Sequence, residues 1–264
     1  MRYLYTEKSR MLWLKRKIKT LLIADSLKRI SAGNELHDYK LMLRSSSQEL
    51  WALHSRLEKI RSDVKSNYDS YDYGNGYYYQ SMPGLNISGY RDTEERIRQL
   101  DLVDRLKNKS VLDVGSNTGF ILLSLSDSIA RGVGVELNPY LVATGNEVKD
   151  YLGCENIDFE ISGFEEYDPQ DACFDVVLSL ANHSTFDGNT RQTVHDYFDK
   201  ISGFLSKDGV LIFESHPPQI EPKEKLGETL SIIELFFDIQ EMPQVDFKGF
   251  LDRSRTYVVA RKKH

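Results

Sequence analysis

The stretch that decides the fold is Val111-Leu-Asp-Val-Gly-Ser-Asn-Thr-Gly119, an apolar run that ends in a turn bounded by two glycines. A second apolar run, Gly132-Val-Gly-Val-Glu136, ends in a carboxylate. Apolar runs rich in β-branched residues are typical of buried parallel strands, and glycines directly after a strand let the backbone approach a ligand. A carboxylate at the tip of the next strand, about 20 residues on, is placed to bind the two hydroxyls of a ribose. The two runs therefore predict a site for a nucleoside-bearing cofactor.

The spacing of the glycines indicates which cofactor. The dinucleotide fingerprint is G-x-G-x-x-G, whereas this turn has Asn117 at the second glycine position, which disfavours NAD or FAD. The turn instead resembles motif I of the class I S-adenosylmethionine (SAM) methyltransferases, D/E-x-G-x-G-x-G, through Asp113, Gly115 and Gly119. Asn tolerates unusual backbone angles better than most residues, so its presence at the middle position is a mild departure. A tight strand-to-helix turn that binds no ligand is the alternative.

The composition is that of an ordinary globular protein. The chain has 264 residues, of which 40% are hydrophobic and 28% charged, and its two cysteines indicate neither a disulfide framework nor a zinc cluster. The sequence contains no apolar run of about 18 residues and no signal-peptide core. A cytoplasmic location, with peripheral membrane contact as a variant of it, is the expectation.

The net charge of −6 conceals an uneven distribution. Residues 1–66 contain 15 Lys and Arg against 7 Asp and Glu, whereas residues 67–264 contain 19 against 33. Apolar side chains with helical spacing predict that the basic region is helical, with Ser31-Ala-Gly-Asn34 separating its helices, and a heptad pattern joins Leu50, Leu53, Leu57, Ile60 and Val64. A solvated helical appendage is the favoured interpretation, and self-association or contact with an anionic surface are the alternatives.

Residues 67–90 are rich in Tyr and Gly and are poor material for a regular helix. Two interpretations are open. Tyr77, Tyr78, Tyr79 and Gln80 line an active-site loop that binds the substrate, or the loop packs over the sheet.

Residues 91–264 alternate predicted strands with predicted helices. The strands are 111–114, 132–136, 157–161, 174–180, 209–214, about 234–241 and 255–261, and the helices are one that starts after Arg91, 118–129, 139–151 and 190–205. This order predicts a doubly wound α/β fold, with a mainly parallel seven-stranded sheet, an antiparallel last strand and an N-terminal helical appendage. The domains are then a basic region (1–66), a Tyr- and Gly-rich loop (67–90) and the SAM-binding domain (91–264).

The resemblance to the class I methyltransferases covers about residues 88–264 and implies further cofactor contacts. Glu136 matches the residue that binds the ribose, while Gly163 and Phe164 follow the third predicted strand, where the adenine lies. Leu180 ends the fourth strand and completes the predicted cofactor set. Arg91 is a candidate for holding the carboxylate of SAM with paired hydrogen bonds, and a surface ion pair is the alternative.

The acceptor side carries two histidines. His183 and His216 follow the fourth and fifth predicted strands, at the edge where open α/β sheets bind ligands, and either can accept a proton from a hydroxyl. Ala181-Asn182-His183 stands in place of the Asn-Pro-Pro-Tyr motif of amino-methylating nucleic-acid enzymes, which favours a hydroxyl acceptor and makes Asn182 a substrate contact. Glu214 and His216, with His183, are the weaker metal candidates in a site predicted to be metal-free.

The predicted function is therefore SAM-dependent methylation of a hydroxyl on a sugar, glycan or glycosylated small molecule, with a His general base. The Tyr-Tyr-Gln element, the segment Gly89-Tyr90-Arg91 and motif I together resemble methyltransferases associated with bacterial surface polysaccharide synthesis, and more distantly wobble-uridine tRNA-modifying enzymes. Methylation of tRNA or another RNA, gripped by residues 1–66, is the alternative, although the acidic charge of the remainder disfavours nucleic acid. A SAM-binding scaffold without catalysis and a nicotinamide oxidoreductase are the others.

Overall fold

The computed structural model describes residues 26–67, 77–170, 173–184, 191–246 and 254–264. The predicted helical pattern before residue 26 and the tyrosines within 68–76 lie outside these ranges. None of the helices in the described ranges is long and apolar enough to cross a bilayer.

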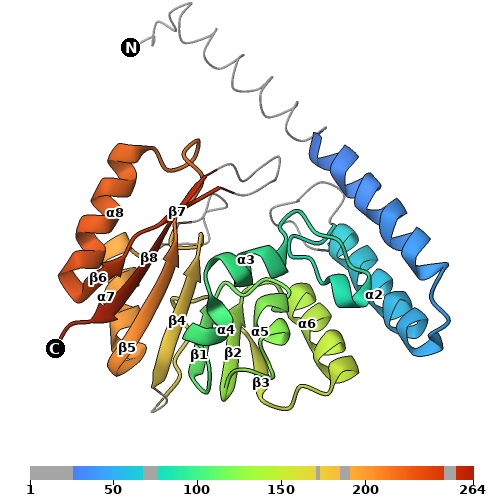
Figure 1. Ribbon diagram of the computed structural model, residues 1–264, viewed down its shortest axis with the longest axis horizontal. Helices are drawn as coiled ribbons and strands as arrows, with labels where there is room; N and C mark the ends of the chain where they lie inside the picture. Colours follow the sequence, from blue (N-terminus) through green and yellow to red (C-terminus); the bar gives the residue numbers. More distant parts are fainter. Residues whose placement is uncertain (1–25, 68–76, 171–172, 185–190, 247–253) are drawn as a thin grey trace, which may run out of the picture.

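A single mixed sheet forms the centre of the molecule, with the strand order β3-β2-β1-β4-β5-β8-β6 (Figure 1). Its strands are β1 Ser110–Val114, β2 Arg131–Glu136, β3 Ile157–Ile161, β4 Phe174–Leu180, β5 Leu205–Glu214, β6 Phe237–Glu241, a two-residue β7 Gln244–Val245 and β8 Arg255–Lys262. Strands β1 to β5 run parallel, and β8 is antiparallel to both β5 and β6. The predicted sheet with a reversed last strand is therefore confirmed, and β7 adds a short edge beside β8.

Alternation along the strands explains why both faces of the sheet are covered. In β1, Val111 points into one apolar core and Leu112 into the other, and Leu211 and Ile212 of β5 divide in the same way. Consecutive side chains of a strand point to opposite faces, so fully apolar strands need helices on both sides. Helices α5 and α6 cover the first face, and α7 and α8 cover the second.

The helices begin where the sequence supplies caps. Asp92 accepts a hydrogen bond from the backbone N of Glu95 at the start of α3, and Asn138 and Thr193 cap α6 and α7 in the same way. The bounds are α2 Gln48–Asn67, η1 Pro83–Leu85, α3 Thr93–Gln99, α4 Leu102–Arg105, α5 Phe120–Ser124, α6 Pro139–Leu152, α7 Val194–Phe204 and α8 Lys223–Phe236. Helix α5 starts later than the predicted residue 118, because Gly119 adopts a left-handed conformation just before it, and it ends at Ser124 instead of residue 129.

The prediction for residues 234–241 was partly wrong. A helix, α8, runs through Phe236, and the strand begins only at Phe237. The sequence carried a signal for this helix, because Leu226, Leu230, Ile233 and Phe237 recur at helical intervals and all pack into the core beside α7.

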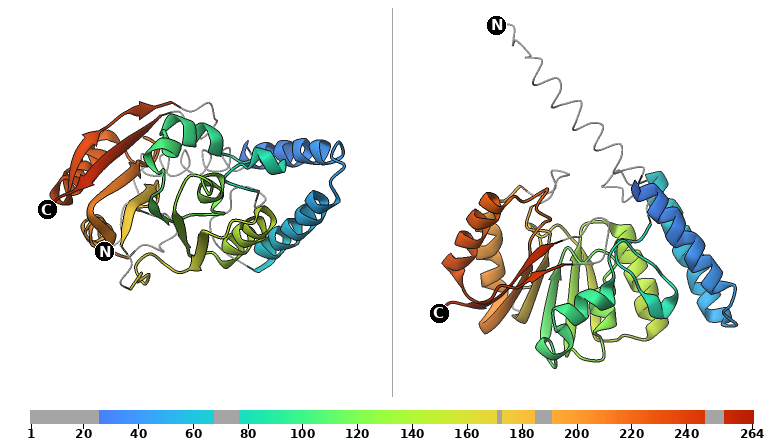
Figure 2. Two further views of the ribbon diagram at one scale, coloured as in Figure 1. Left: turned by 60° about the horizontal axis from the view of Figure 1, so that its bottom comes forward. Right: turned by 45° about the horizontal axis from the view of Figure 1, so that its top comes forward.

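Two N-terminal helices form a hairpin at the edge of the molecule remote from β8 and α8 (Figures 1 and 2). Helix α2 packs against α6, where Arg56 pairs with Glu147 at 2.6 Å, and Leu53 and Leu57 of the predicted heptad are buried. Residues 26–42 form one continuous helix, so the predicted break at residues 31–34 was wrong. A single exposed Gly costs a helix only about 1 kcal/mol, and packing of Leu27, Ser31 and Met42 outweighs it.

Candidate functional site

The glycine turn after β1 has the backbone conformation that its sequence predicts. Gly115, Asn117 and Gly119 all have positive φ angles, of 64°, 56° and 70°. A side chain at Gly115 would overlap the amide of Asn182, and one at Gly119 would overlap the ring of Phe159. Asn117 therefore replaces the middle glycine of the motif without changing the turn, because Asn tolerates the left-handed region.

Glu136 lies at the tip of β2 and faces this turn. Its two carboxylate oxygens accept hydrogen bonds from the backbone N of Asn117 at 3.0 Å and of Asn138 at 2.9 Å. These two bonds hold the carboxylate at the turn, where the ribose of a nucleoside cofactor would lie. The structure thus brings together the two features that predicted the cofactor site.

Buried polar atoms without partners surround the turn. Within the described ranges they include Asp113 Oδ2, Ser116 Oγ, Asn117 Oδ1 and Asn182 Nδ2. Burial raises the pKa of Asp113 to about 7, against the charge of Arg96, which lowers it. Buried polar groups are normally paired, so four such atoms around one turn suit a polar ligand such as SAM.

The side chain of Gln80 forms three hydrogen bonds with the glycine turn and the start of α5. Its Nε2 donates to the carbonyl of Ser116 at 3.1 Å, and its Oε1 accepts from Thr118 Oγ1 at 3.2 Å and from the backbone N of Phe120 at 2.9 Å. The last bond satisfies one of the open N–H groups of α5. Gln80, which we predicted to bind substrate, is therefore engaged with the cofactor turn in this structure.

The neighbouring tyrosines divide between packing and the site. The Tyr77 hydroxyl donates to Asp38 in the N-terminal helix, and Tyr78 packs against Tyr77 and Phe120 with ring centroids 5.1 and 6.1 Å apart. These two side chains follow the packing interpretation of the loop. Tyr79 is half-buried beside Arg91, whose Nη1 donates to its hydroxyl at 3.4 Å.

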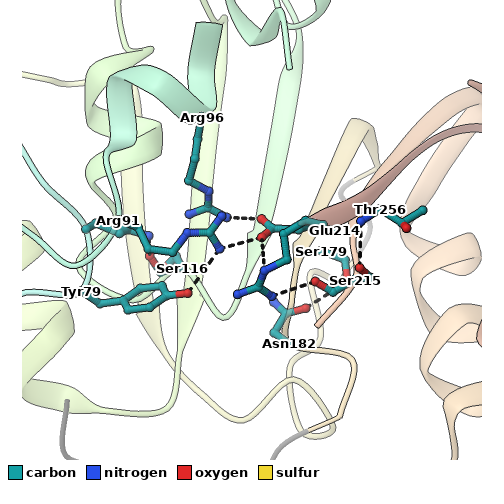
Figure 3. A network of polar contacts seen from close by, with 11 residues as sticks. Tyr79, Arg91, Arg96, Ser116, Ser179, Asn182, Glu214, Ser215 and Thr256 are labelled. Atoms are coloured by element: carbon teal, nitrogen blue, oxygen red, sulfur yellow. Dashed lines mark hydrogen bonds and ion pairs between the residues drawn. The ribbon is translucent and has the colours of Figure 1, made fainter. Parts of the chain in front are cut away.

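Glu214 ends β5 inside a cluster of three arginines (Figure 3). Its oxygens lie 2.6 Å from Arg91 Nη1, 2.5 Å from Arg96 Nη2 and 3.7 Å from Arg255 Nε. All four side chains are at most 5% exposed. Burial alone would raise the pKa of Glu214, but the guanidinium groups hold it far below its usual value.

This cluster bears on two predictions. Arg91 forms a buried ion pair instead of the surface pair that we weighed against a SAM contact. Glu214 faces cations, which is an unsuitable environment for a metal ligand, and the described residues contain no group of three or more His, Cys, Asp or Glu side chains that could hold a metal ion.

Asn182 lies beside the glycine turn. Its Oδ1 accepts from Ser179 Oγ at 2.9 Å (Figure 3). It also accepts from Tyr197 Oη at 2.8 Å, and the two bonds fix the amide plane. With its oxygen occupied, Asn182 directs its Nδ2 donor towards Gly115. The side chain is therefore positioned to donate to a ligand held at the turn.

The two predicted histidines come together beyond the ends of β4 and β5. The rings of His183 and His216 have centroids 4.8 Å apart. His183 Nε2 lies 3.0 Å from Glu221 Oε1, and Glu221 also accepts from the backbone N of His216 and from Thr229 Oγ1. Burial raises the pKa of Glu221, but these hydrogen bonds and the neighbouring His183 ring lower it to about 2.

Glu221 was not predicted, because it lies in an irregular segment after two prolines and no local pattern marks it. Burial and the neighbouring His183 lower the pKa of His216 to about 4. His216 is therefore neutral at pH 7.

The remaining predicted cofactor residues lie at the ends of β3 and β4. The Phe164 ring packs against Tyr197 and Phe204, with centroids 5.0 and 5.9 Å apart, so part of its surface is committed to the core under α7. Gly163 precedes it, with the Glu166 carboxylate in the space of a side chain, and Leu180 is half-buried at the end of β4.

The strand order, the reversed β8 and the glycine turn facing Glu136 define a Rossmann-like SAM-dependent methyltransferase. The model of the methyltransferase domain family matches residues 105–246, more than half of the chain, and the protein belongs to this family. It is an enzyme and its cofactor is SAM, as the sequence predicted.

A known protein resembles part of the chain in sequence. A ribosomal RNA small subunit methyltransferase G of Helicobacter bizzozeronii is 36% identical over 103 residues, which are 36% of this chain and 58% of that relative. The chain thus spans little more than half the length of the curated relative it matches.

Solved structures support the fold. The N-methyltransferase NodS from Bradyrhizobium japonicum, in complex with S-adenosyl-L-homocysteine, aligns with a TM-score of 0.53 and 14% identity over 65% of this chain and 87% of NodS. A SAM-dependent methyltransferase from Aquifex aeolicus aligns with a TM-score of 0.51 and 17% identity over 65% and 90%.

Proposed function

We propose that this methyltransferase acts on a hydroxyl group, with His183 as the general base. The observation that carries the proposal is the pairing of His183 Nε2 with Glu221 at 3.0 Å. An ionised carboxylate only accepts hydrogen bonds, so Nε2 donates to it, and in the neutral ring Nδ1 then carries the lone pair. Within the described ranges, Nδ1 is buried and has no hydrogen-bond partner.

The chemistry of methyl transfer explains why such a base is useful. SAM supplies an electrophilic methyl group, and transfer to a hydroxyl needs the proton to be removed as the new bond forms. The His183 ring is held between Phe198, Phe213 and His216, so Nδ1 has a fixed direction. Because His216 is neutral at pH 7, it adds no charge that would oppose proton uptake by His183.

For the acceptor, we propose a sugar or glycosylated molecule. Sugars present hydroxyl groups, and the excess of 33 acidic over 19 basic residues beyond position 66 opposes broad contact with a polyanion. Of the three tyrosines predicted to bind substrate, Tyr79, with a half-buried ring and a hydroxyl beside Arg91, is the candidate for stacking on a sugar.

Base substitutions test the hydroxyl chemistry. Full-length protein, labelled SAM and deproteinised glycan extracts are incubated, and transfer is measured for His183→Ala and Glu221→Gln. We expect loss of about 10²–10⁴-fold for His183→Ala and about tenfold for Glu221→Gln, with SAM affinity by calorimetry unchanged.

The exposed His195 of α7 supplies the control, since His195→Ala should transfer at the wild-type rate. Full activity in His183→Ala would reject His183 as the base. If the wild type and His183→Ala methylate glycans equally well, the proposal of a glycan acceptor stands and the proposal of His183 as the base is rejected.

A second candidate is methylation of RNA, because the relative at 36% identity is named as a ribosomal RNA methyltransferase and residues 1–66 carry an excess of basic residues. Total RNA is therefore the second acceptor pool. Transfer into RNA, with none into glycans, would replace the glycan proposal.

A further inference from the structure

The helix of residues 26–42 leaves an apolar stripe in solvent. Leu36, Tyr39 and Leu43 are 54%, 55% and 60% exposed, and their spacing of three and four residues puts them on one side of the helix. Leu43 follows the helix end, but its backbone N still bonds to the carbonyl of Tyr39 at 2.9 Å, so it continues the same stripe. This helix lies at the outer edge of the molecule (Figures 1 and 2).

Cations border the stripe on both sides. By the rotation of about 100° per residue in a helix, Lys40 lies on one border and Lys28 on the other. Arg44 lies in the turn that follows the helix, next to Leu43 in the chain. All three are exposed.

The acidic residues of this helix already have partners. Asp38 is 5% exposed and accepts from the backbone N of Ser88 at 2.8 Å, and Glu35, whose side chain is 50% exposed, pairs with Arg61 at 2.7 Å. The charge of Glu35 is therefore matched by a cation, and the outer face presents apolar side chains together with basic ones.

We propose that this basic and apolar face, formed by Lys28, Leu36, Tyr39, Lys40, Leu43 and Arg44, docks on an anionic lipid surface. An interfacial helix buries its apolar side chains at the boundary of the acyl chains while its flanking Lys and Arg contact anionic headgroups. The proposal concerns where the enzyme works and is independent of the acceptor and of the base.

Charge decides against the other occupants. A second copy seated symmetrically on this face would place cations opposite cations. Residues 1–25 of the same chain are also rich in Lys and Arg, so the cations of this face would repel them too. A nucleic acid would satisfy the cations but would leave Leu36 and Leu43 without an apolar partner. A lipid surface satisfies both kinds of side chain.

Cosedimentation with vesicles tests the proposal. Full-length protein is mixed with vesicles of phosphatidylcholine alone, or with vesicles in which about 30% of the lipid is phosphatidylglycerol, which makes their surface anionic. We expect binding to the anionic vesicles that weakens with salt, and at least about tenfold weaker partitioning for Leu36→Ser with Leu43→Ser and for Lys40→Glu with Arg44→Glu.

Matched controls lie at the far side of the molecule. Leu235 of α8 is 60% exposed, as is Leu43, and Lys207 is an exposed cation of β5, so Leu235→Ser and Lys207→Glu should bind as the wild type does. Equal binding to both vesicle types, or unchanged binding of either double variant, would overturn the proposal.

Two further measurements exclude the other partners. Conversion of a dimer to a monomer by the leucine variant in analytical ultracentrifugation would overturn it in favour of a second copy. RNA binding that depends on Lys40 and Arg44 without any vesicle binding would overturn it in favour of nucleic acid.

Discussion

The carboxyl ends of β1 and β2, called here the β1–β2 edge, and those of β4 and β5, the β4–β5 edge, build their parts of the site in different ways. At the β1–β2 edge, the backbone forms the site, because Gly115 and Gly119 have positive φ angles. Glu136 and Gln80 accept hydrogen bonds from backbone N–H groups of this turn and of the start of α5. At the second, charged side chains from separate segments meet, as around Glu214. A backbone turn depends on local sequence, whereas a charge cluster depends on the complete fold.

The largest test of this comparison is Glu214→Gln. It leaves three buried arginines without their carboxylate, so we expect the free energy of unfolding to fall by about 3–5 kcal/mol. Urea denaturation measures it. The exposed pair between Arg105 and Glu241 is the control, because Glu241→Gln should cost less than about 1 kcal/mol. Equal costs would mean that the cluster does not hold the β4–β5 edge.

Gly115→Ala tests the backbone edge. The substitution forces a side chain into a φ of 64° and to within 2.8 Å of Asn182 Nδ2, so SAM affinity should fall by about 10–100-fold. Gly153 has a similar φ of 68° but has open space around it and lies at the end of α6. Gly153→Ala should lower stability by about 1 kcal/mol and leave the calorimetric SAM affinity unchanged. Loss of affinity in both would point to general unfolding.

Gln80→Ala tests whether the turn needs its side-chain clamp. Removing three hydrogen bonds leaves the backbone N of Phe120 without its acceptor, and we expect the KM for SAM to rise about 5–10-fold with kcat unchanged at saturation. Gln99→Ala, which removes a bond to Glu95 on α3, is the control. A fall in kcat instead would assign Gln80 to the acceptor, as its sequence position first indicated.

The last test is a pH dependence at Asp113. Its pKa rises from 3.8 in the unfolded chain to about 7 in the fold, so folding favours the protonated form. The stability that this form contributes is present at low pH and is lost as pH rises through this range. Thermal unfolding of the cofactor-free protein should show Asp113→Asn gaining on the wild type from pH 4 to about pH 7. A constant difference across this range would contradict the shift.

The same contrast explains what the sequence could predict. Asp113, Gly115, Gly119 and Glu136 belong to one strand-turn-helix-strand unit, so their spacing predicted both the fold and the cofactor. The two histidines were predicted from strand ends alone.

Long-range partners escaped prediction. Glu221 reaches His183 across 38 positions, and Arg91 reaches Glu214 across 123, so no local pattern signals either pair. The composition around Tyr77 and Tyr78 is typical of a binding loop, but Tyr77 donates a hydrogen bond to Asp38 and Tyr78 packs against Phe120. These two contacts depend on the tertiary structure, which residue type alone does not predict.

The position of β8 has a consequence for synthesis on the ribosome. This strand follows β5 and β6 in the chain but lies between them, and it supplies Arg255 to Glu214. While residues 255–262 are still inside the exit tunnel, β5 has an open edge and β6 has no partner strand in the sheet. A nascent chain can therefore complete its glycine turn early, yet the arginine cluster closes only after translation has passed β8.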